Sequence, residues 1–396
     1  MSAASISFGP VLADLDASGL RRRRRTVRRL SHETAAIELD GHACIDFCSN
    51  DYLGLSAHPR VTAAFIEAAR IHGVGARASH LITGHQAEHH ALEEELAAFT
   101  GRERAILFST GYMANLGLAT ALVRKGGAVF GDRLNHASLI DAGRISRAEL
   151  HHYPHGDVAT LERKLAARGP GPALVLTDGV FSMDGDLAPL PALAAACARQ
   201  GAFFGVDDAH GLGVIGATGR GSLEHFRLSP KQVPALVGTL GKAFGSFGAF
   251  VAGDADLIET LVQRARTYIY TTALPAAVAA ATRAALAVSI EESWRRERVL
   301  ALTRRFRELA VAAGLPLADS TTPIQPVLLG GADIAVEASR KLLDRGFFVA
   351  AIRPPTVPAG TSRLRVALSA AHRDSDVEAL AAALAEIAPP GPAAPE

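Results

Sequence analysis

Three side chains with complementary chemistry follow two apolar runs in the middle of the chain. Lys242 lies in the glycine-containing stretch GTLGKAFG, directly after the run VPALVGTL, which reads as a buried strand. Asp207 and His210 follow a second such run, AFFGV. In open α/β sheets ligands bind where strands end, so an amine, a carboxylate and an imidazole are expected to meet there. An amine among small residues can attack a carbonyl carbon and form a Schiff base.

Each of these residues also has a structural alternative. An isolated lysine is usually a solvated surface charge, and an acid at a strand end can cap a helix. The glycines around Lys242 favour a ligand-facing amine, and the spacing does not fit a phosphate-binding P-loop. Asp207 and His210 lie within four residues of each other after a buried strand, with Asp208 expected to be structural. An acid beside a pyridine nitrogen keeps it protonated, so the sequence predicts pyridoxal phosphate (PLP), with His210 on the ring hydroxyl oxygen.

Further candidates lie near other predicted strand ends. His136 could stack on a flat cofactor or be a core histidine. Gly111 and Tyr112 open a predicted helix, whose free N–H groups bind phosphate readily. Ser182 and Thr239 could add hydroxyl donors. No metal is expected, because the histidines at helical spacing, His85, His89 and His90, lack an accompanying acid pattern.

Two arginine-rich segments offer anion sites. Residues 1–30 are expected to be helical, and the arginine run 21–25 is either a solvated helix end or a site for a phosphate or carboxylate group. In RPPTVPAGTSRLR, Arg353 precedes two prolines that stiffen its loop, which suits capture of a carboxylate. Arg363 and Arg365 would share one face of a strand, where surface salt bridges are expected.

Composition narrows the class of protein. The chain has 396 residues and a formal charge of +1, without the broad basic surplus of a nucleic-acid binder. Its three cysteines form no metal-like grouping and are expected to be reduced, as in a cytoplasmic protein. Neither a signal peptide nor an apolar run long enough to span a membrane is expected.

The order of patterns predicts an α/β fold. Between 105 and 253, short apolar strands alternate with glycine turns and helices, which indicates a mainly parallel sheet covered on both faces. A long helix over 274–312 would lead to a smaller α+β part. The expected organisation is an N-terminal segment of helix and hairpin over 1–48, a large PLP-binding domain over 49–290, a small domain over 291–390 and a disordered tail over 391–396.

Several motifs together carry a family resemblance across about residues 15–390. The chain resembles the α-oxoamine synthases, PLP enzymes of the aspartate-aminotransferase fold (fold type I) that condense an amino acid with an acyl thioester. The segment RPPTVPAGTSRLR is most similar to the member of the family that acts in biotin biosynthesis. The motifs, in the order of the family, are SNDYLGL, FSTGYMAN, NHASLID, VFSMDGD, VDDAHG, GTLGKAFG and YTTALP.

The resemblance implies roles for the candidate residues. Lys242 would carry the Schiff base, Asp207 would pair with the ring nitrogen, and His210 would contact the ring oxygen. The other implied roles are His136 stacked on the ring; Gly111, Tyr112, Ser182 and Thr239 on the cofactor or its phosphate; Asn50 and Arg353 on the amino-acid carboxylate; and Arg22 and Thr356 on the acyl substrate.

The implied substrates are L-alanine and a pimeloyl thioester of CoA or acyl-carrier protein, and the implied assembly is a homodimer. Within the family the competing pair is glycine with acetyl-CoA or another acyl chain. Arg77, where relatives often have a Gly-Gly-Ser stretch, bears on acyl preference. Outside the family, an NAD-dependent oxidoreductase would need a G-x-G-x-x-G after the first strand, which is missing. A non-enzymatic binding module is the third alternative.

Overall fold

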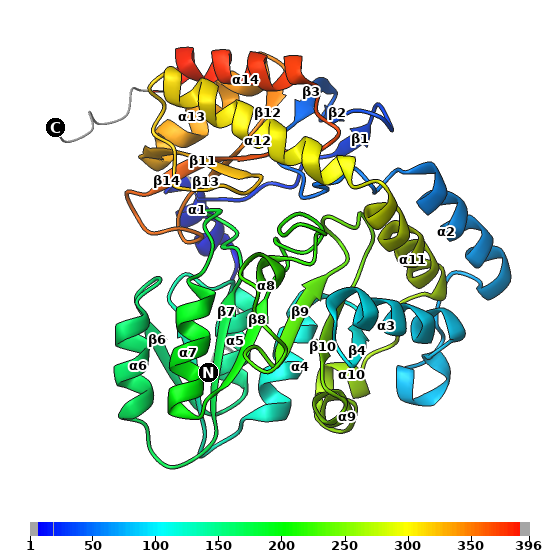
Figure 1. Ribbon diagram of the computed structural model, residues 1–396. Coiled ribbons are helices and arrows are strands. Elements are labelled where there is room, and N and C mark those ends of the chain that lie inside the picture. The colour runs from blue at the N-terminus through cyan, green and yellow to red at the C-terminus, as the bar shows by residue number, and fades with distance from the viewer. Residues whose placement is uncertain (1–6, 19, 389–396) are drawn as a thin grey trace, which may run out of the picture.

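The protein consists of a large part built on a seven-stranded sheet and a smaller part that lies against one edge of it (Figure 1). The computed structural model describes residues 7–18 and 20–388. The predicted disordered tail over 391–396 and the first six residues of the predicted N-terminal segment therefore lie outside the described residues. The domain boundaries given by the sequence stay a prediction.

The large sheet confirms the predicted fold class. Strand β10 runs antiparallel to both of its neighbours, and all the other neighbouring strands are parallel. Strand β6 was not predicted, because its sequence ELHHY at the edge of the sheet has no continuous apolar run. The order across the sheet is β4 (Arg104–Phe108), β10 (Ala249–Gly253), β9 (Ala235–Thr239), β8 (Phe203–Asp207), β7 (Ala173–Asp178), β5 (Ala128–Asp132) and β6 (Glu149–Tyr153).

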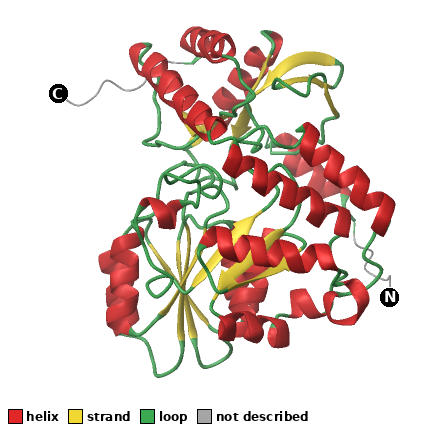
Figure 2. Cartoon of the chain, turned by 45° about the vertical axis from the view of Figure 1, so that its right-hand side comes forward, coloured by secondary structure: helices red, strands yellow, loops and turns green. Residues whose placement is uncertain are grey.

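Alternate residues of these strands point into two separate cores, as the two-residue period of a strand requires. Ile106 packs in one core and Leu107, the next residue, in the other. Figure 2 shows helices on both sides of the sheet. The first core contains residues of α4 (Gly111–Leu122), α5 (Ala137–Ile145), α9 (Ala255–Arg264) and α10 (Arg266–Ile269). The second contains residues of α3 (Ala87–Thr100), α6 (Val158–Ala166), α7 (Leu190–Gln200) and α8 (Ser222–His225).

The smaller part contains segments from both the N-terminal and the C-terminal region of the chain. The hairpin of β2 and β3 is continued by β12 from the C-terminal region, which pairs parallel to β3. The predicted strand over 346–352 is in fact divided between two sheets, because the chain passes from one sheet to the other at Val349. One sheet is β1 (Val27–Arg29), β2 (Ala36–Leu39), β3 (His42–Asp46) and β12 (Phe347–Phe348); the other is β11 (Ile324–Gly330), β14 (Ser362–Ala367) and β13 (Ala350–Ile352).

Two helix predictions were wrong in extent. The helix expected over 274–312 is two helices, because the chain turns at Glu292. The carboxylate of Glu292 pairs with Arg295 at 2.7 Å and lies 3.4 Å from His58. Near the N-terminus only α1 (Gly9–Ala17) is helical among the described residues. Like charges one turn apart destabilise a helix, which explains why the arginine run lies outside it. The remaining helices are α2 (Pro59–His72), η1 (His80–Gly84), α11 (Ala276–Glu291), α12 (Trp294–Ala312), α13 (Ala332–Asp344) and α14 (Asp374–Ile387).

No helix among the described residues is both long and apolar enough to cross a lipid bilayer.

His155 ties two loops together near the end of strand β5. Its Nδ1 lies 3.1 Å from an oxygen of Asp132, and its Nε2 lies 2.9 Å from an oxygen of Asp186. The hydrogen bond to Asp132, followed by that to Asp186, raises the pKa of His155 to about 10. The imidazolium form is therefore favoured in the folded protein.

This pairing predicts a loss of stability at alkaline pH. The folded pKa is raised, so the contribution of His155 is complete below about pH 6.5 and is lost as the pH rises towards about 10. We expect His155→Gln to lower the midpoint of thermal unfolding at pH 6.5 and to flatten its decline with pH. Unfolding scans across this range, with exposed His225→Gln as the control, test this; equal slopes for the wild-type protein and His155→Gln would contradict it.

Candidate active site

The carboxyl ends of the parallel strands meet at the edge of the sheet that faces the smaller part (Figure 1). Asp178 and Asp207, the last residues of β7 and β8, are register partners and lie side by side. Thr239 ends the next strand, β9. This edge is where parallel α/β sheets bind ligands.

Lys242 lies in the turn after β9 and points towards His210. Its Nζ is 2.8 Å from Nε2 of His210, whose Nδ1 is 2.7 Å from the hydroxyl of Tyr52. Burial lowers the pKa of Lys242 to about 8, although the charges of Asp207 and Asp178 oppose the shift. Burial, reinforced by the charge of Lys242, also lowers the pKa of His210 well below its usual value. The site thus contains a neutral imidazole and an amine that loses its proton near neutral pH.

Asp207 supplies the negative charge of the site. The side-chain amide of Asn115 donates to its Oδ2 at 2.6 Å, and the backbone N–H of Ala209 donates to its Oδ1 at 3.1 Å. Burial, followed by the charge of Asp207, raises the pKa of the adjacent Asp178 well above its ordinary value. Two carboxylates this close cannot both ionise at low cost, so the neutral form of Asp178 is favoured.

His136 belongs to the same site and is fixed by the start of helix α5. Its Nδ1 accepts from the backbone N–H of Ser138 at 3.2 Å and lies 2.7 Å from the Ser138 hydroxyl. The backbone N–H of His136 donates to Asp178 at 2.6 Å. Burial lowers the pKa of His136, which the nearby charges of Asp207 and Lys242 also influence. These contacts fix the direction of the ring, which can therefore stack on a flat cofactor.

Helix α4 begins at the same edge with an open first turn. Its cap Thr110 accepts from the N–H of Met113 at 3.2 Å, and a Cβ added to Gly111 would meet no atom within 4 Å. The first N–H groups of a helix have no intrahelical acceptor and bind phosphate well. Tyr112 is exposed, and its hydroxyl contacts Asp141.

The two predicted hydroxyl donors lie at this edge, Thr239 at the end of β9 and Ser182 in the loop after β7. Thr239 donates to the carbonyl of Gly248 at 3.2 Å, and the carbonyl of Ser182 accepts from Arg365 at 2.6 Å.

This set of groups fits PLP. An amine of lowered pKa, an anionic carboxylate and neutral imidazoles face one site, with an open helix start at the same edge. These are the groups that an aldehyde, a pyridinium nitrogen, a ring hydroxyl and a phosphate require. The charge of Asp207 acts on Lys242, so the two residues that the sequence analysis put first belong to one site.

Arg365 is the main residue that the sequence analysis misplaced. The expectation of surface salt bridges for Arg363 and Arg365 was wrong, because both are buried. They lie on β14, the central strand of its sheet, and reach the loop after β7: Arg363 pairs with Asp184, and Arg365 donates to the carbonyl of Ser182. A strand that pairs with a neighbour on each side is buried. Only the order of strands in the sheet reveals that β14 is such a strand.

The residues predicted to bind substrate form two groups. Asn50 accepts from Arg365 Nη2 at 3.2 Å. Arg353 instead donates to the carbonyl of Arg21 at 3.3 Å. Arg22 Nη2 lies 3.5 Å from the hydroxyl of Thr356, so the N-terminal arginine run adjoins the loop that carries Arg353. The predicted pair of Arg22 and Thr356 is brought together, whereas Asn50 contacts Arg365.

Comparison with known proteins identifies the family of the chain. The model of the family described as aminotransferase class I and II matches residues 42–384. The chain belongs to this family. It is 56% identical over 386 residues to the 8-amino-7-oxononanoate synthase of Methylococcus capsulatus, covering 97% of this chain and 99% of that protein. It is 58% identical to the same-named protein of Thioalkalivibrio sulfidiphilus, covering 93% and 94% of the two chains.

Solved structures give the same result for the fold. The serine palmitoyltransferase of S. paucimobilis with bound PLP–myriocin aldimine superposes with a TM-score of 0.91 at 31% identity, covering 96% of this chain and 97% of that one. An 8-amino-7-oxononanoate synthase from Francisella tularensis superposes with a TM-score of 0.76 at 32% identity, covering 87% and 97%. The predicted fold type I architecture, the PLP cofactor and the resemblance to the α-oxoamine synthases are confirmed. The roles of individual residues stay predictions.

Asn115, which the sequence analysis gave no role beyond its place in the motif FSTGYMAN, is expected to position Asp207. Asn115→Ala removes the donor to Asp207 Oδ2 and should weaken PLP binding at least about tenfold, because a hydrogen bond to a charged group contributes roughly 1.5–3 kcal/mol. Spectrophotometric titration of the apoenzyme with PLP measures this. Thr120→Ala on the same helix, whose hydroxyl donates only to backbone carbonyls, is the control; equal PLP affinity in the two variants would contradict the assignment.

Proposed function

We propose that the protein catalyses the decarboxylative condensation of L-alanine with a pimeloyl thioester, giving 8-amino-7-oxononanoate, CO2 and the free thiol. The observation that carries the proposal is the identity of 54–58% over most of the chain with relatives that are named 8-amino-7-oxononanoate synthase. The thioester carrier is CoA or acyl-carrier protein. The reaction is a step of biotin biosynthesis, and its expected location is the cytoplasm.

The proposed catalytic residues have two kinds of role: one transfers protons, and the others supply charge or orient a group. PLP, when bound, supplies an electron-withdrawing ring that stabilises negative charge at the substrate Cα. Lys242, whose pKa is lowered to about 8, is the general base that removes the α-proton of alanine and later returns a proton to the same carbon. Asp207, oriented by Asn115, presents its negative charge to the ring nitrogen. His210, held by Tyr52, orients the Lys242 amine.

We assign the carboxylate of alanine to Arg365 together with Asn50. The guanidinium of Arg365 is buried and donates to Asn50 and to the carbonyl of Ser182, so its direction is fixed. Its charge influences both Lys242 and His210, which places it within electrostatic reach of the reacting groups. A rigid guanidinium suits bidentate capture of a carboxylate. Arg353, the candidate from the sequence, lies in a more exposed loop.

The acyl substrate is assigned to the entrance formed by the N-terminal arginines and the loop of Thr356. The stretch 21–26 lines a surface cavity of about 800 Å³, and Arg22 contacts Thr356 there. Arg21 and Arg25 are paired with Asp16 and Asp40. A pimeloyl chain ends in a carboxylate, and a thioester carrier bears phosphate, so positive charge at this entrance favours both.

We propose that the enzyme works as a homodimer, as the family resemblance implies. Exposed large apolar side chains occur on the loop over 73–85, on the loop after Lys242 and just before Thr272, and such side chains are typical of a protein–protein interface. Ser79 forms a β-bridge with Thr272, so the loop over 73–85 and the YTTALP segment are coupled. The exposed apolar residues include Leu81, Ile82, Phe247 and Tyr270.

The reaction is tested by mass spectrometry of the product formed from alanine and pimeloyl-CoA. Lys242→Ala should lower kcat at least about a hundredfold, because it removes the general base, and it should abolish the visible absorbance of lysine-bound PLP. Lys231→Ala, an exposed lysine before β9, should leave both unchanged. Full activity of Lys242→Ala would contradict the role of this lysine, and a preference for glycine with acetyl-CoA would overturn the choice of substrates.

The assignment of the carboxylate is tested by paired substitutions. Arg365→Lys should raise the KM for alanine roughly tenfold or more, because a lysine cannot reproduce the bidentate geometry. Arg353→Lys should change it by less than about threefold, since that arginine is placed outside the alanine site. Steady-state kinetics at saturating thioester measure both values, and circular dichroism checks the fold of each variant. A larger effect at Arg353 would restore the assignment made from the sequence.

A further inference from the structure

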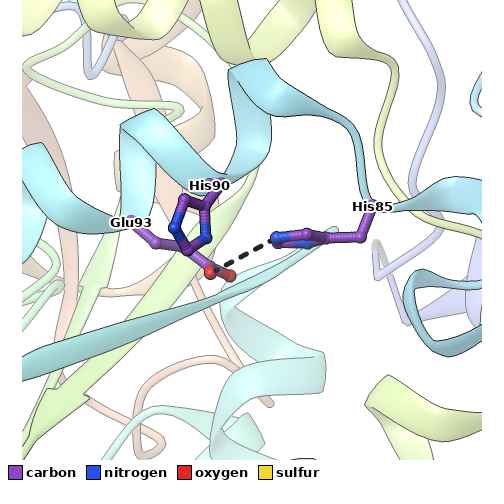
Figure 3. A group of neighbouring side chains, drawn as sticks. All are labelled: His85, His90 and Glu93. Carbon is purple, nitrogen blue, oxygen red and sulfur yellow. Dashed lines mark ion pairs between the residues drawn. The ribbon is translucent and has the colours of Figure 1, made fainter.

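A cluster of histidines lies away from the active site, at the start of helix α3. His80 is the first residue of η1, and His85 directly follows this helix. His90 projects from the first turns of α3, close to Glu93 (Figure 3). The sequence analysis found no acid partner for these histidines. The structure supplies one, because Glu93 follows His90 by three residues and so lies on the same helix face. A cavity of about 380 Å³ opens beside His85, His90 and Glu93.

Three possible ligand atoms converge at this point. Nε2 of His85 lies 3.9 Å from Oε2 of Glu93, and one ligand atom from each of His85, His90 and Glu93 lies within 4.8 Å of the others. Ligands of a tetrahedral zinc ion with bonds of about 2.0–2.1 Å are roughly 3.4 Å apart. Small rotations of the side chains are therefore enough to bring the three atoms onto one ion. His90 is exposed, so an ion can reach the site from solvent.

Neighbouring groups already orient two of the three side chains. Nδ1 of His85 lies 3.0 Å from Nδ1 of His80, which leaves Nε2 of His85 facing Glu93. Glu93 Oε1 accepts from the backbone N–H of Leu107 at 2.9 Å, which leaves Oε2 facing His85. Such outer contacts are what hold the ligands of a metal site in place.

His89 is excluded as a ligand although it lies between the others in sequence. Its Nδ1 accepts from the backbone N–H of Gln86 at 2.9 Å, and its Nε2 lies 2.6 Å from the carbonyl of Leu274. Both ring nitrogens are therefore engaged. This histidine instead ties the start of α3 to the segment that follows Thr272.

Negative charge predominates around the cluster. Three acids, Glu93, Glu94 and Glu103, line the cavity together with one arginine, Arg104. Glu94 lies 3.5 Å from His90 and adds negative charge at the mouth of the site. Imidazole is the commonest side-chain ligand of metal ions, so this set of groups suits a cation.

We propose that His85, His90 and Glu93 bind one divalent transition-metal ion of the zinc type, with water completing its coordination. Two imidazoles and one carboxylate suit Zn²⁺ better than Mg²⁺ or Ca²⁺, which prefer oxygen ligands. The ion would fasten the end of η1 to helix α3. Since η1 follows Ser79, which pairs with Thr272, the site would stabilise this loop. The proposal does not depend on the function proposed for the active site.

The test uses the full-length, PLP-loaded protein without a histidine tag. Calorimetric titration with ZnCl2 should show one tight site per chain, and Zn²⁺ should raise the midpoint of thermal unfolding whereas Mg²⁺ should not. Titration with Co²⁺ should give visible absorption bands of a site with nitrogen and oxygen ligands. His90→Ala and the near-isosteric Glu93→Gln should each weaken Zn²⁺ binding at least tenfold.

The matched control is His151→Ala. His151 forms an ordinary pair with Glu149 at 3.5 Å and takes no part in the cluster, so this variant should bind Zn²⁺ like the wild-type protein. His90 is exposed, so its removal is expected to leave the fold intact, which circular dichroism and PLP content check. Absence of Zn²⁺ binding in the wild-type protein, or unchanged binding in His90→Ala and Glu93→Gln, would overturn the proposal.

Discussion

The active site depends on keeping the Lys242 amine in surroundings that disfavour its charge. Its Nζ meets a neutral imidazole of His210 at 2.8 Å instead of a carboxylate, and burial lowers the pKa of the amine to about 8. A direct ion pair would hold the proton on the amine and remove its value as a nucleophile and base. Asp207 is near enough to act on Lys242, yet its two oxygens are held by Asn115 and Ala209.

Close packing beneath the site holds the loop after β8 in place. Asp208, next to Asp207, turns away from the reacting groups and accepts from the N–H of Ser222 at 2.7 Å. A Cβ added to Gly221 would lie 1.9 Å from Oδ2 of Asp208, and one added to Gly211 would lie 2.2 Å from Oδ1. Only glycine fits at such distances, so these glycines anchor the loop that carries His210.

The meeting of Lys242, Asp207 and Gly111 at one sheet edge could be predicted from local sequence, whereas their roles stay predictions. Lys242, Asp207 and Gly111 each follow a short apolar run, and parallel strands place their ends at one edge. Asn115 could not be found in this way, because it lies in the middle of a helical pattern and its contact with Asp207 joins residues 92 positions apart. Arg365 was misjudged because its burial follows from the order of strands in the sheet, where β14 lies between β11 and β13.

The sequence alone therefore determined the strand and helix pattern, the family and the residues at strand ends, since each of these rests on the order and spacing of nearby residues. The tertiary structure decided that Arg365 is buried and contacts Asn50, that Arg22 meets Thr356 across 334 positions, and that the hairpin of β2 and β3 joins β12. These contacts depend on how distant elements pack. A pattern of neighbouring residues specifies which face of an element is apolar, whereas the partner of that face is fixed only when the whole chain folds.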